Sequence, residues 1–256
     1  VDSTALGFAG GFPGEFISKT LEESKIHTDF IEVDEDTRIN VKLKSGQETE
    51  INAPGPKVTQ DQFQALLTQI KNTTNKDTVI VAGSVPNSIP SDAYAQIAEI
   101  TKNTGAKLVV DAEKDLVETV LPYQPLFIKP NKDELEVMFN TTVSSDQDVV
   151  KYGKEILKKG AQSVIISLGG DGAVYVDEQQ SIKAVNPQGK VINTVGSGDS
   201  TVAGMVAGLE SGLSIQDAFK QAVASGTATA FEEDLATRDA IEKIKSQVTV
   251  SVLDGE

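Results

Sequence analysis

The sequence has 256 residues, a formal net charge of −15, no cysteine and a single histidine. This length is enough for one large α/β domain with a well-filled core, and it does not by itself require two domains. The negative charge argues against binding to nucleic acid or to anionic membranes, since both need basic patches. With no cysteine and only His27, the composition excludes a thiol nucleophile, an ordinary Ser-His-Asp triad and a zinc site of cysteines and histidines.

The N-terminal part shows no signal-peptide pattern, and no apolar run approaches the roughly 18 residues that span a membrane, so we expect a cytoplasmic protein. The chain enters almost at once on a strand-like apolar run over Ala5–Ala9. The glycine-rich segment 10–14 then predicts a tight turn into a helix over 15–24. The expected apolar face of this helix consists of Phe16, Ile17 and Leu21.

Between residues 28 and 56 the pattern changes to short segments that alternate apolar and polar side chains. The expected strands lie at 29–33, 39–44 and 49–51. Strands with this period of two are half exposed, so we expect them to form a small sheet beside the main one. The pattern therefore divides the chain into a β unit over 28–56 and an α/β unit made of 1–27 and 57–256.

From residue 57 onward, helical and strand patterns alternate regularly. A capping box at 59–62, Thr-Gln-Asp-Gln, starts the first helix of this part. Repeated βαβ units of this kind indicate a parallel sheet covered by helices on both faces. Strands are predicted at 78–82, 107–111, 126–129, 163–167, 173–176, 182–185, 190–192 and 248–253. Helices are predicted at 91–102, 116–121, 146–159 and 218–231.

Polar motifs follow the predicted strands directly. Gly83-Ser84 comes after the strand at 78–82, Asp111 ends the next strand, and Lys129-Pro130-Asn131 ends the third. In open sheets of this type, ligands bind beyond the C-terminal ends of the strands. The pair Asn131 and Glu134, taken alone, is a common pattern of a helix N-cap.

The stretch Asn193–Ser200 carries the most specific signal in the sequence. Gly196 and Gly198 allow backbone angles that a Cβ would forbid, so successive N–H groups can turn inward. A helix that begins near Asp199 adds the positive end of its dipole to the same concavity, which predicts an anion-binding site. Asp199 would repel an anion, so we interpret it as a base that takes a proton from a hydroxyl attacking a phosphate. The alternative interpretation is that Asp199 is only an N-cap after a glycine turn.

The segments around this stretch favour the phosphate site. A β-prone run precedes it, and the helix that follows is made largely of small residues, which would let it pack close to a sheet. No G-x-x-x-x-G-K-[ST] loop occurs, and Thr201 stands where a dinucleotide-binding fingerprint needs its third glycine. A Walker-type NTPase and a dinucleotide oxidoreductase are therefore disfavoured.

The motif Asn-Thr-Val-Gly-Ser-Gly-Asp-Ser resembles the C-terminal signature of the ribokinase-like carbohydrate kinases, also called the PfkB family. Val195 and Ser200 make it similar to the branch of 1-phosphofructokinases and tagatose-6-phosphate kinases, and the similarity extends over nearly the whole chain. The resemblance implies a three-layer α/β/α fold with a mostly parallel sheet. It makes 28–56 a β lid that closes over the sugar and can pair between subunits of a homodimer. It also implies a first strand and a Gly-Gly-Lys-Gly-type motif before residue 1, so we expect an N-terminally incomplete α/β unit.

The resemblance further assigns roles to individual residues, with ATP and Mg²⁺ as cofactors. The catalytic group is Asp199 as base, with the N–H groups of Val195 to Asp199, which include those of Gly196, Ser197 and Gly198, holding the transferred phosphoryl group. The nucleotide contacts are Lys129, Asn131, Ser167, Gly169, Gly172 and Gly226. The sugar-phosphate contacts are Gly10, Gly11, Arg38, Asn40, Ser84 and Asp199. Asn131 and Glu134 would order Mg²⁺, which keeps several water molecules and needs few protein oxygens.

These roles predict an ATP-dependent kinase that phosphorylates the 6-hydroxyl of fructose 1-phosphate to give fructose 1,6-bisphosphate. A tagatose-6-phosphate kinase is the alternative within the family, because the mechanism does not separate the two. An alternative from another class is a catalytically inactive fragment that binds sugar phosphate and nucleotide. For Arg38 the competing interpretation is a solvated charge on a hairpin, and for Phe12 and Pro13 in the segment 10–14 it is a tight strand-to-helix turn.

Overall fold

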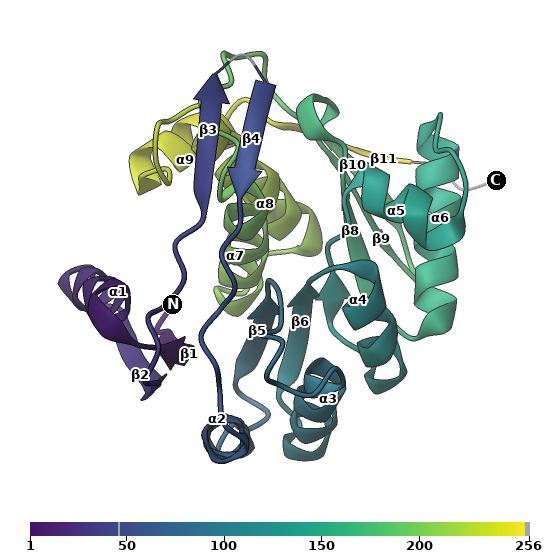
Figure 1. Ribbon diagram of the computed structural model, residues 1–256. Helices are drawn as coiled ribbons and strands as arrows, with labels where there is room; N and C mark the ends of the chain where they lie inside the picture. Colours follow the sequence, from purple (N-terminus) through teal and green to yellow (C-terminus); the bar gives the residue numbers. More distant parts are fainter. Residues whose placement is uncertain (46, 254–256) are drawn as a thin grey trace.

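The computed structural model describes residues 1–45 and 47–253. Its centre is a seven-stranded sheet with the strand order β11-β10-β9-β8-β7-β6-β5 (Figure 1). Strands β5 to β8 are parallel to one another, as the βαβ pattern predicts, whereas β9, β10 and β11 each run antiparallel to their neighbours. The strands are β5 Thr78–Ala82, β6 Lys107–Asp111, β7 Phe127–Ile128, β8 Ser163–Ser167, β9 Ala173–Asp177, β10 Ser181–Val185 and β11 Thr249–Val252.

Helices cover both faces of this sheet, so the fold has the predicted three layers. One face carries α2 Gln60–Lys71, α3 Ala93–Thr104, α4 Lys114–Val120, α5 Lys132–Phe139 and α6 Asp146–Lys159. The other face carries α7 Ser197–Glu210, α8 Ile215–Ala230 and α9 Arg238–Lys245. Two single 3₁₀ turns lie at Leu121–Tyr123 and Gly169–Asp171. The predicted capping box at the start of α2 is confirmed, since Thr59 and Gln62 exchange both of its hydrogen bonds.

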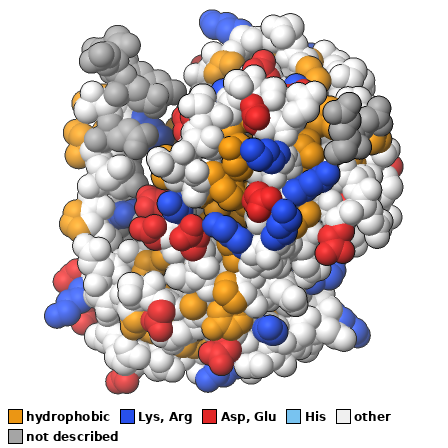
Figure 2. All heavy atoms as spheres, turned by 90° about the vertical axis from the view of Figure 1, so that its right-hand side faces the viewer, with side chains coloured by type: hydrophobic (Ala, Val, Ile, Leu, Met, Phe, Trp, Pro, Cys, Tyr) orange, Lys and Arg blue, Asp and Glu red, His pale blue; other side chains and the backbone are white. Residues whose placement is uncertain are grey.

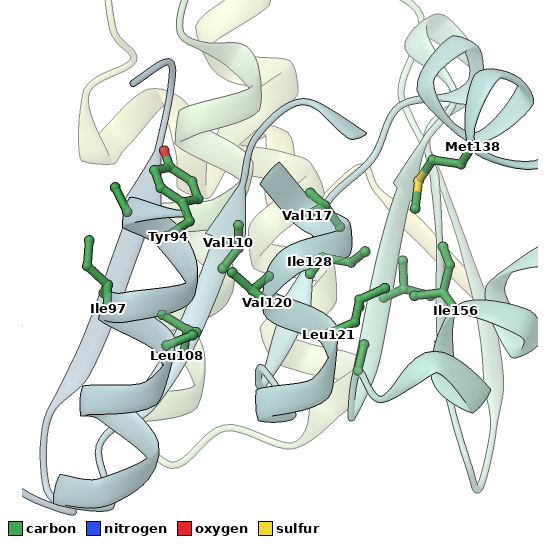
Figure 3. Close-up of a cluster of buried hydrophobic side chains, with 14 of the residues drawn as sticks. Tyr94, Ile97, Leu108, Val110, Val117, Val120, Leu121, Ile128, Met138 and Ile156 are labelled. Atoms are coloured by element: carbon green, nitrogen blue, oxygen red, sulfur yellow. The ribbon is translucent and has the colours of Figure 1, made fainter. Parts of the chain in front are cut away.

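The alternation of side chains along the strands produces two separate cores. In β6, Leu108 and Val110 belong to the core beneath α2 to α6, whereas Val109 belongs to the core beneath α7 and α8. Figure 3 shows the first core, where side chains of α3 and α4 lie against those of β6 and β7. A sheet that is apolar on both faces requires near-continuous apolar strands, which is what these segments contain.

The contact between α7 and α8 is unusually close. A Cβ added to Gly204 would lie 2.9 Å from the Cα of Ala222, and one added to Gly208 would lie 2.8 Å from the Cα of Ala218. The small residues of α7 were expected to bring it close to a sheet. Instead they bring it close to α8, while α7 meets the sheet through larger side chains such as Met205.

The N-terminal segment forms a second, smaller βαβ unit. Strands β1 Thr4–Ala9 and β2 His27–Glu32 pair in parallel, and α1 Gly11–Glu23 connects them in the sequence. The prediction that 29–33 joins the small sheet is therefore wrong, because that sheet contains only β3 Val41–Ser45 and β4 Gln47–Ile51. The expected apolar face of α1 is also not buried, since Phe16 is 70% exposed and α1 buries Pro13 and Gly14 instead.

One face of the molecule carries charges of both signs. On the face drawn in Figure 2, Lys and Arg side chains lie among Asp and Glu side chains, with hydrophobic side chains between them. This face therefore has no extended basic field of the kind that nucleic acid requires. None of the described helices has the length and apolar composition needed to cross a bilayer.

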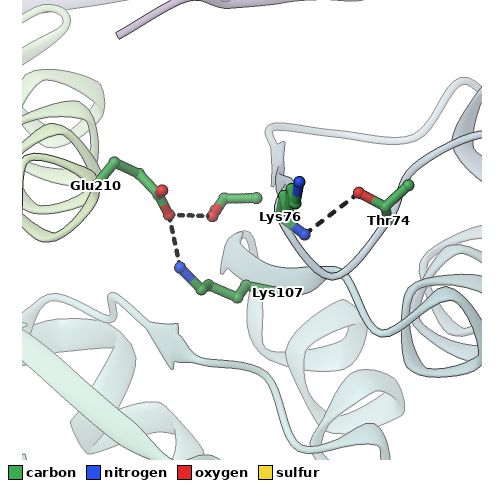
Figure 4. A network of polar contacts seen from close by, with 5 residues as sticks. Thr74, Lys76, Lys107 and Glu210 are labelled. Carbon is green, nitrogen blue, oxygen red and sulfur yellow. Dashed lines mark hydrogen bonds and ion pairs between the residues drawn. The ribbon is translucent and has the colours of Figure 1, made fainter.

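An ion-pair network ties α7 to the N-terminal ends of two strands (Figure 4). Glu210, the last residue of α7, accepts hydrogen bonds from Lys107 Nζ and from Thr78 Oγ1, each at 2.8 Å. These two hydrogen bonds hold the pKa of Glu210 below its ordinary value of 4.5. A carboxylate with a lowered pKa stabilises the fold above its ordinary pKa, and the stabilisation disappears as the pH falls through the folded-state value.

We therefore expect Glu210→Gln to lower the free energy of unfolding by about 1 kcal/mol at neutral pH, because a hydrogen bond from a charged donor is weakened and the ion pair is lost. The difference from the wild type should disappear in acid, where Glu210 is protonated in both states. Denaturant unfolding monitored from neutral pH down to the acid range measures this. A difference that stays constant across that range would contradict the assignment.

Candidate active site at the C-terminal edge of the sheet

The polar motifs predicted at the strand ends lie at one edge of the sheet. Because β5 to β8 are parallel, the segments that follow them leave the sheet on the same side. Asn131 forms a parallel bridge with Ser167, and Gly83 N donates to Asp111 O at 3.1 Å, so neighbouring strand ends are also bonded to each other. The edge is thus a continuous row of backbone and polar groups.

A cavity of about 500 Å³ opens at this edge. It lies between the ends of β7 and β8, the turn at 169–172, the segment 186–194 and the helices α7 and α8. All residues assigned to the nucleotide from the resemblance contribute to its lining, namely Lys129, Asn131, Ser167, Gly169, Gly172 and Gly226. Ser197 and Gly198 line it as well, so the cavity meets the start of α7.

The side chains of Asn186 and Thr227 connect the walls of the cavity, and the sequence pattern did not indicate either of them. Asn186, directly after β10, donates through Nδ2 to Gly169 O at 3.0 Å. Its Oδ1 accepts a hydrogen bond from Thr227 Oγ1 of α8 at 2.9 Å. One amide therefore connects the turn at 169–172 to α8, and only its position after a strand could have drawn attention to it.

The start of α7 has the backbone arrangement of an anion site. Gly196 is the N-cap and has a φ of +79°, a left-handed conformation that favours glycine. Within the described chain, the N–H groups of Gly196, Gly198 and Asp199 donate to no protein acceptor. The N–H of Val195 donates to Asn193 Oδ1 and that of Ser197 to Thr194 O, so these two of the expected donors are already engaged.

The segment before α7 is not a strand, and the predicted strand at 190–192 is wrong. The N–H groups of Ile192 and Asn193 both donate to Ala230 O, at 2.8 and 3.2 Å. These bonds fasten the segment to the end of α8 rather than to the sheet. The β-prone composition of the run is overridden by this long-range contact.

The carboxylate of Asp199 is not an N-cap. The N-cap position belongs to Gly196, and no side chain caps α7. Asp199 lies in the first turn of the helix and is exposed. The simpler interpretation of Asp199 as a capping residue therefore fails, and the carboxylate is available at the edge of the anion site.

Asn131 and Glu134 form the capping box of α5. Asn131 Oδ1 accepts from Glu134 N at 2.8 Å, and Glu134 Oε2 accepts from Asn131 N at 2.7 Å. Each side chain keeps a further oxygen lone pair for another partner. No cluster of three or more His, Cys, Asp or Glu side chains that could hold a metal ion occurs among the described residues.

On the other side of the edge, a hydrogen bond brings together two residues assigned to the sugar phosphate. Arg38 Nη2 donates to Ser84 Oγ at 2.9 Å, across 46 residues of sequence. Gly10 binds the loop that carries Arg38, since its N–H donates to Thr37 Oγ1 and its carbonyl accepts from Thr37 N. Gly11 packs against Asp36 of the same loop, while Asn40 lies exposed farther along it.

Between the two sides lies an ion pair of low exposure. Lys129 Nζ is 3.3 Å from Asp111 Oδ2, and the two side chains are 8% and 19% exposed. Burial raises the pKa of Asp111 above 3.8, an effect that Lys129 partly offsets and the charge of Asp199 reinforces. Burial, reinforced by Asp111, also raises the pKa of Tyr94 to about 12. Charges of both signs are thus gathered next to the start of α7.

Phosphotransferases are one class of protein that combines a covered mixed sheet, a cavity at its edge and a helix start with N–H groups that can bind phosphate. The profile of the family described as pfkB family carbohydrate kinase matches residues 1–241. The chain therefore belongs to the pfkB family of carbohydrate kinases, whose members use ATP.

Individual relatives agree with this membership. A 1-phosphofructokinase of Bacillus subtilis is 44% identical over 99% of this chain and 84% of its own length. A D-tagatose-1-phosphate kinase of Bacillus licheniformis is 37% identical over 99% of this chain and 84% of its own length. A solved structure from Staphylococcus aureus, described as a candidate phosphofructokinase, is 80% identical with a TM-score of 0.92. That match covers 100% of this chain and 84% of the other.

The packing of Gly226 gives a test of how the site is built. A Cβ on Gly226 would collide with Thr201 Oγ1 and would lie 2.8 Å from Ser197 O, so the residue is small because α7 touches α8 there. We expect Gly226→Ala to lower the free energy of unfolding by about 1–3 kcal/mol through overpacking. Chemical denaturation measures this.

Gly170→Ala is the matched control, because Gly170 lines the same cavity and nothing lies within 4 Å of its added Cβ. It should leave the free energy of unfolding almost unchanged. Equal stability of the two variants would show that the close contact at Gly226 does not hold α7 in place.

Proposed function

We propose that the chain catalyses ATP-dependent phosphorylation of a ketohexose phosphate, with fructose 1-phosphate as substrate and fructose 1,6-bisphosphate as product. The observation that carries this proposal is the carboxylate of Asp199, which does not cap the helix and lies beside three N–H groups that have no acceptor among the described residues, next to a cavity of about 500 Å³. A cavity of this size accommodates a nucleotide-sized ligand. The choice of fructose 1-phosphate rests on the 44% identity to a 1-phosphofructokinase.

The chemistry follows from the order of groups along the edge. ATP binds in the cavity, with its terminal phosphate at the N–H groups of Gly196, Gly198 and Asp199. These donors and the helix dipole stabilise the charge that develops on the phosphoryl oxygens. Asp199 takes the proton of the sugar hydroxyl as its oxygen forms a bond to the γ-phosphorus, and the bond from that phosphorus to ADP breaks.

Mg²⁺ would be held near Asn131 and Glu134, chiefly through water molecules and the nucleotide phosphates, and would neutralise phosphate charge. The capping box already fixes both side chains at the start of α5. Their role in the apo chain is therefore to present oxygens in a constant position beside the cavity.

The sugar phosphate would be recognised on the Arg38 side of the edge. A guanidinium and a hydroxyl at 2.9 Å from each other can together bind one phosphate group through charge-assisted hydrogen bonds. Phosphate recognition at this end leaves the far end of the sugar free to meet Asp199. This arrangement accounts for a substrate that already carries one phosphate.

A tagatose phosphate kinase is the second candidate, favoured by the 37% identity to a tagatose-1-phosphate kinase. Coupled measurement of ADP release with the 1-phosphates and 6-phosphates of fructose and tagatose tests both. We expect the highest kcat/KM with fructose 1-phosphate. If a tagatose phosphate is clearly preferred, it replaces fructose 1-phosphate as the assigned substrate. If none of the four sugar phosphates is turned over, the proposed function is contradicted.

Asp199→Asn tests the proposed base, since the amide keeps the shape of the carboxylate and removes its basicity. We expect kcat to fall on the order of 10²-fold or more, while the Kd of ATP stays the same or falls because a negative charge next to the phosphates is lost. Steady-state kinetics and calorimetry measure the two effects. Full retention of turnover would show that Asp199 is not the base.

Arg38→Ala tests recognition of the sugar phosphate. Losing a charge-assisted hydrogen bond worth about 1.5–3 kcal/mol should raise the KM for the sugar phosphate roughly 10-fold to 100-fold and change the KM for ATP little. Arg238→Ala is the control, because Arg238 begins α9, on the face of the sheet that carries α7 and α8, and is the only other arginine in the sequence. Equal increases in both KM values for Arg38→Ala would indicate a role in folding alone.

A further inference from the structure

The ion pair of Lys129 and Asp111 lies directly against the anion site. A Cβ built on Gly198 would be 3.3 Å from Lys129 Nζ and 3.8 Å from Asp111 Oδ2. Gly198 provides one of the unpaired N–H groups at the start of α7. The ammonium group is therefore placed next to the peptide that would contact the transferred phosphoryl group, and Lys129 also lines the cavity.

Asp111 connects this cation to the other side of the edge. Its backbone carbonyl accepts a hydrogen bond from Gly83 N, the residue before Ser84, at 3.1 Å. Tyr94 Oη donates to Gly83 O at 2.8 Å and fixes the same turn. The carboxylate of Asp111 faces Lys129 Nζ, so one residue contacts both the sugar-phosphate turn and the cation of the nucleotide side.

Fold stability alone does not account for a pair in this position. Taking two charges out of water costs energy, and replacing a buried ion pair by apolar side chains is often neutral or stabilising. A lysine side chain also has four rotatable bonds, so an ammonium group beside a cavity is poorly fixed unless a partner holds it. Asp111 supplies that partner at 3.3 Å, on a strand end that is itself hydrogen-bonded to its neighbour.

We propose that Asp111 is a positioning residue that holds the Lys129 ammonium against Gly198, where the cation stabilises the phosphoryl group during its transfer. This inference rests on the proposed function, because it concerns the same phosphoryl group. Asp111 itself does not touch the substrate and acts through Lys129. Its effect on turnover should therefore depend on the presence of Lys129.

A double-mutant cycle measures this dependence, using Lys129→Met, Asp111→Asn and the double variant. Lys129→Met removes the ammonium group that stabilises the phosphoryl group, and it should lower kcat on the order of 10²-fold. Asp111→Asn removes only the carboxylate that holds this ammonium group, and it should lower kcat about 10-fold. The double variant should have the kcat of Lys129→Met, because Asp111 acts only through Lys129. Independent, multiplying effects on kcat would overturn the proposal.

Each single variant leaves one charge without its partner and can lower kcat by destabilising the fold. The double variant removes both charges, so it separates this effect from the loss of a catalytic contact. Glu210→Gln is the matched control: β6 carries Lys107, paired with Glu210, at one end and Asp111, paired with Lys129, at the other. It should lower stability without lowering kcat. An equal fall in kcat for Glu210→Gln and Asp111→Asn would show that Asp111 contributes only stability.

Wild-type turnover is measured first, so that failure of the proposed function is recognised separately. The Kd of ATP is then measured by calorimetric titration for the same set of variants, which requires no sugar phosphate. Asp111→Asn should change the Kd of ATP at least threefold when Lys129 is present and should leave it unchanged in the Lys129→Met background. The same change in both backgrounds would overturn the role assigned to Asp111 even if no sugar phosphate is turned over.

Discussion

The close contact between α7 and α8 is the constraint on which the site depends. Two helix backbones approach to this distance only where side chains are almost absent, as at Gly204, Gly208 and Gly226. The contact fixes the start of α7, and with it the N–H groups that face the edge of the sheet. It also makes α8 a wall of the cavity, so the anion site and the nucleotide-sized space are set by the same packing.

The electrostatics of the site are local. A chain with a net charge of −15 would repel an anionic ligand at long range, but salt screens exposed charges beyond about 8–10 Å. Within that distance the edge offers unpaired N–H groups, the Lys129 ammonium and the Arg38 guanidinium. An anion that reaches the edge therefore meets an environment unlike the average surface of the protein.

Much of the fold follows from local pattern. The strands β5, β6 and β8 and the helix α6 begin and end where the sequence predicts, because apolar runs and capping boxes are determined by neighbouring residues. Pairing is not local: β2 alternates like a half-exposed strand of a small sheet, yet its partner is β1. The run at 190–192 fails for the same reason, since its hydrogen bonds go to the end of α8.

The site shows the same division. Spacing and residue type placed the motifs at the strand ends, and the topology of parallel strands then brought them to one edge. Asn186 could not be found from spacing, because its partners Gly169 and Thr227 are distant in sequence. Asp111 stood out as a strand-end carboxylate, but only the fold shows that Lys129 is its partner.

The hydrogen bond between Arg38 and Ser84 also bears on how a ligand enters. In the free chain the guanidinium is already occupied by an internal acceptor, so the loop that carries it is tethered to the end of β5. An incoming phosphate must compete with Ser84 for this donor, but it meets two groups that already converge. Part of the entropy that binding would otherwise cost is therefore lost already when the chain folds. The site favours charged ligands, because a phosphate accepts a stronger hydrogen bond from the guanidinium than the neutral hydroxyl of Ser84 does.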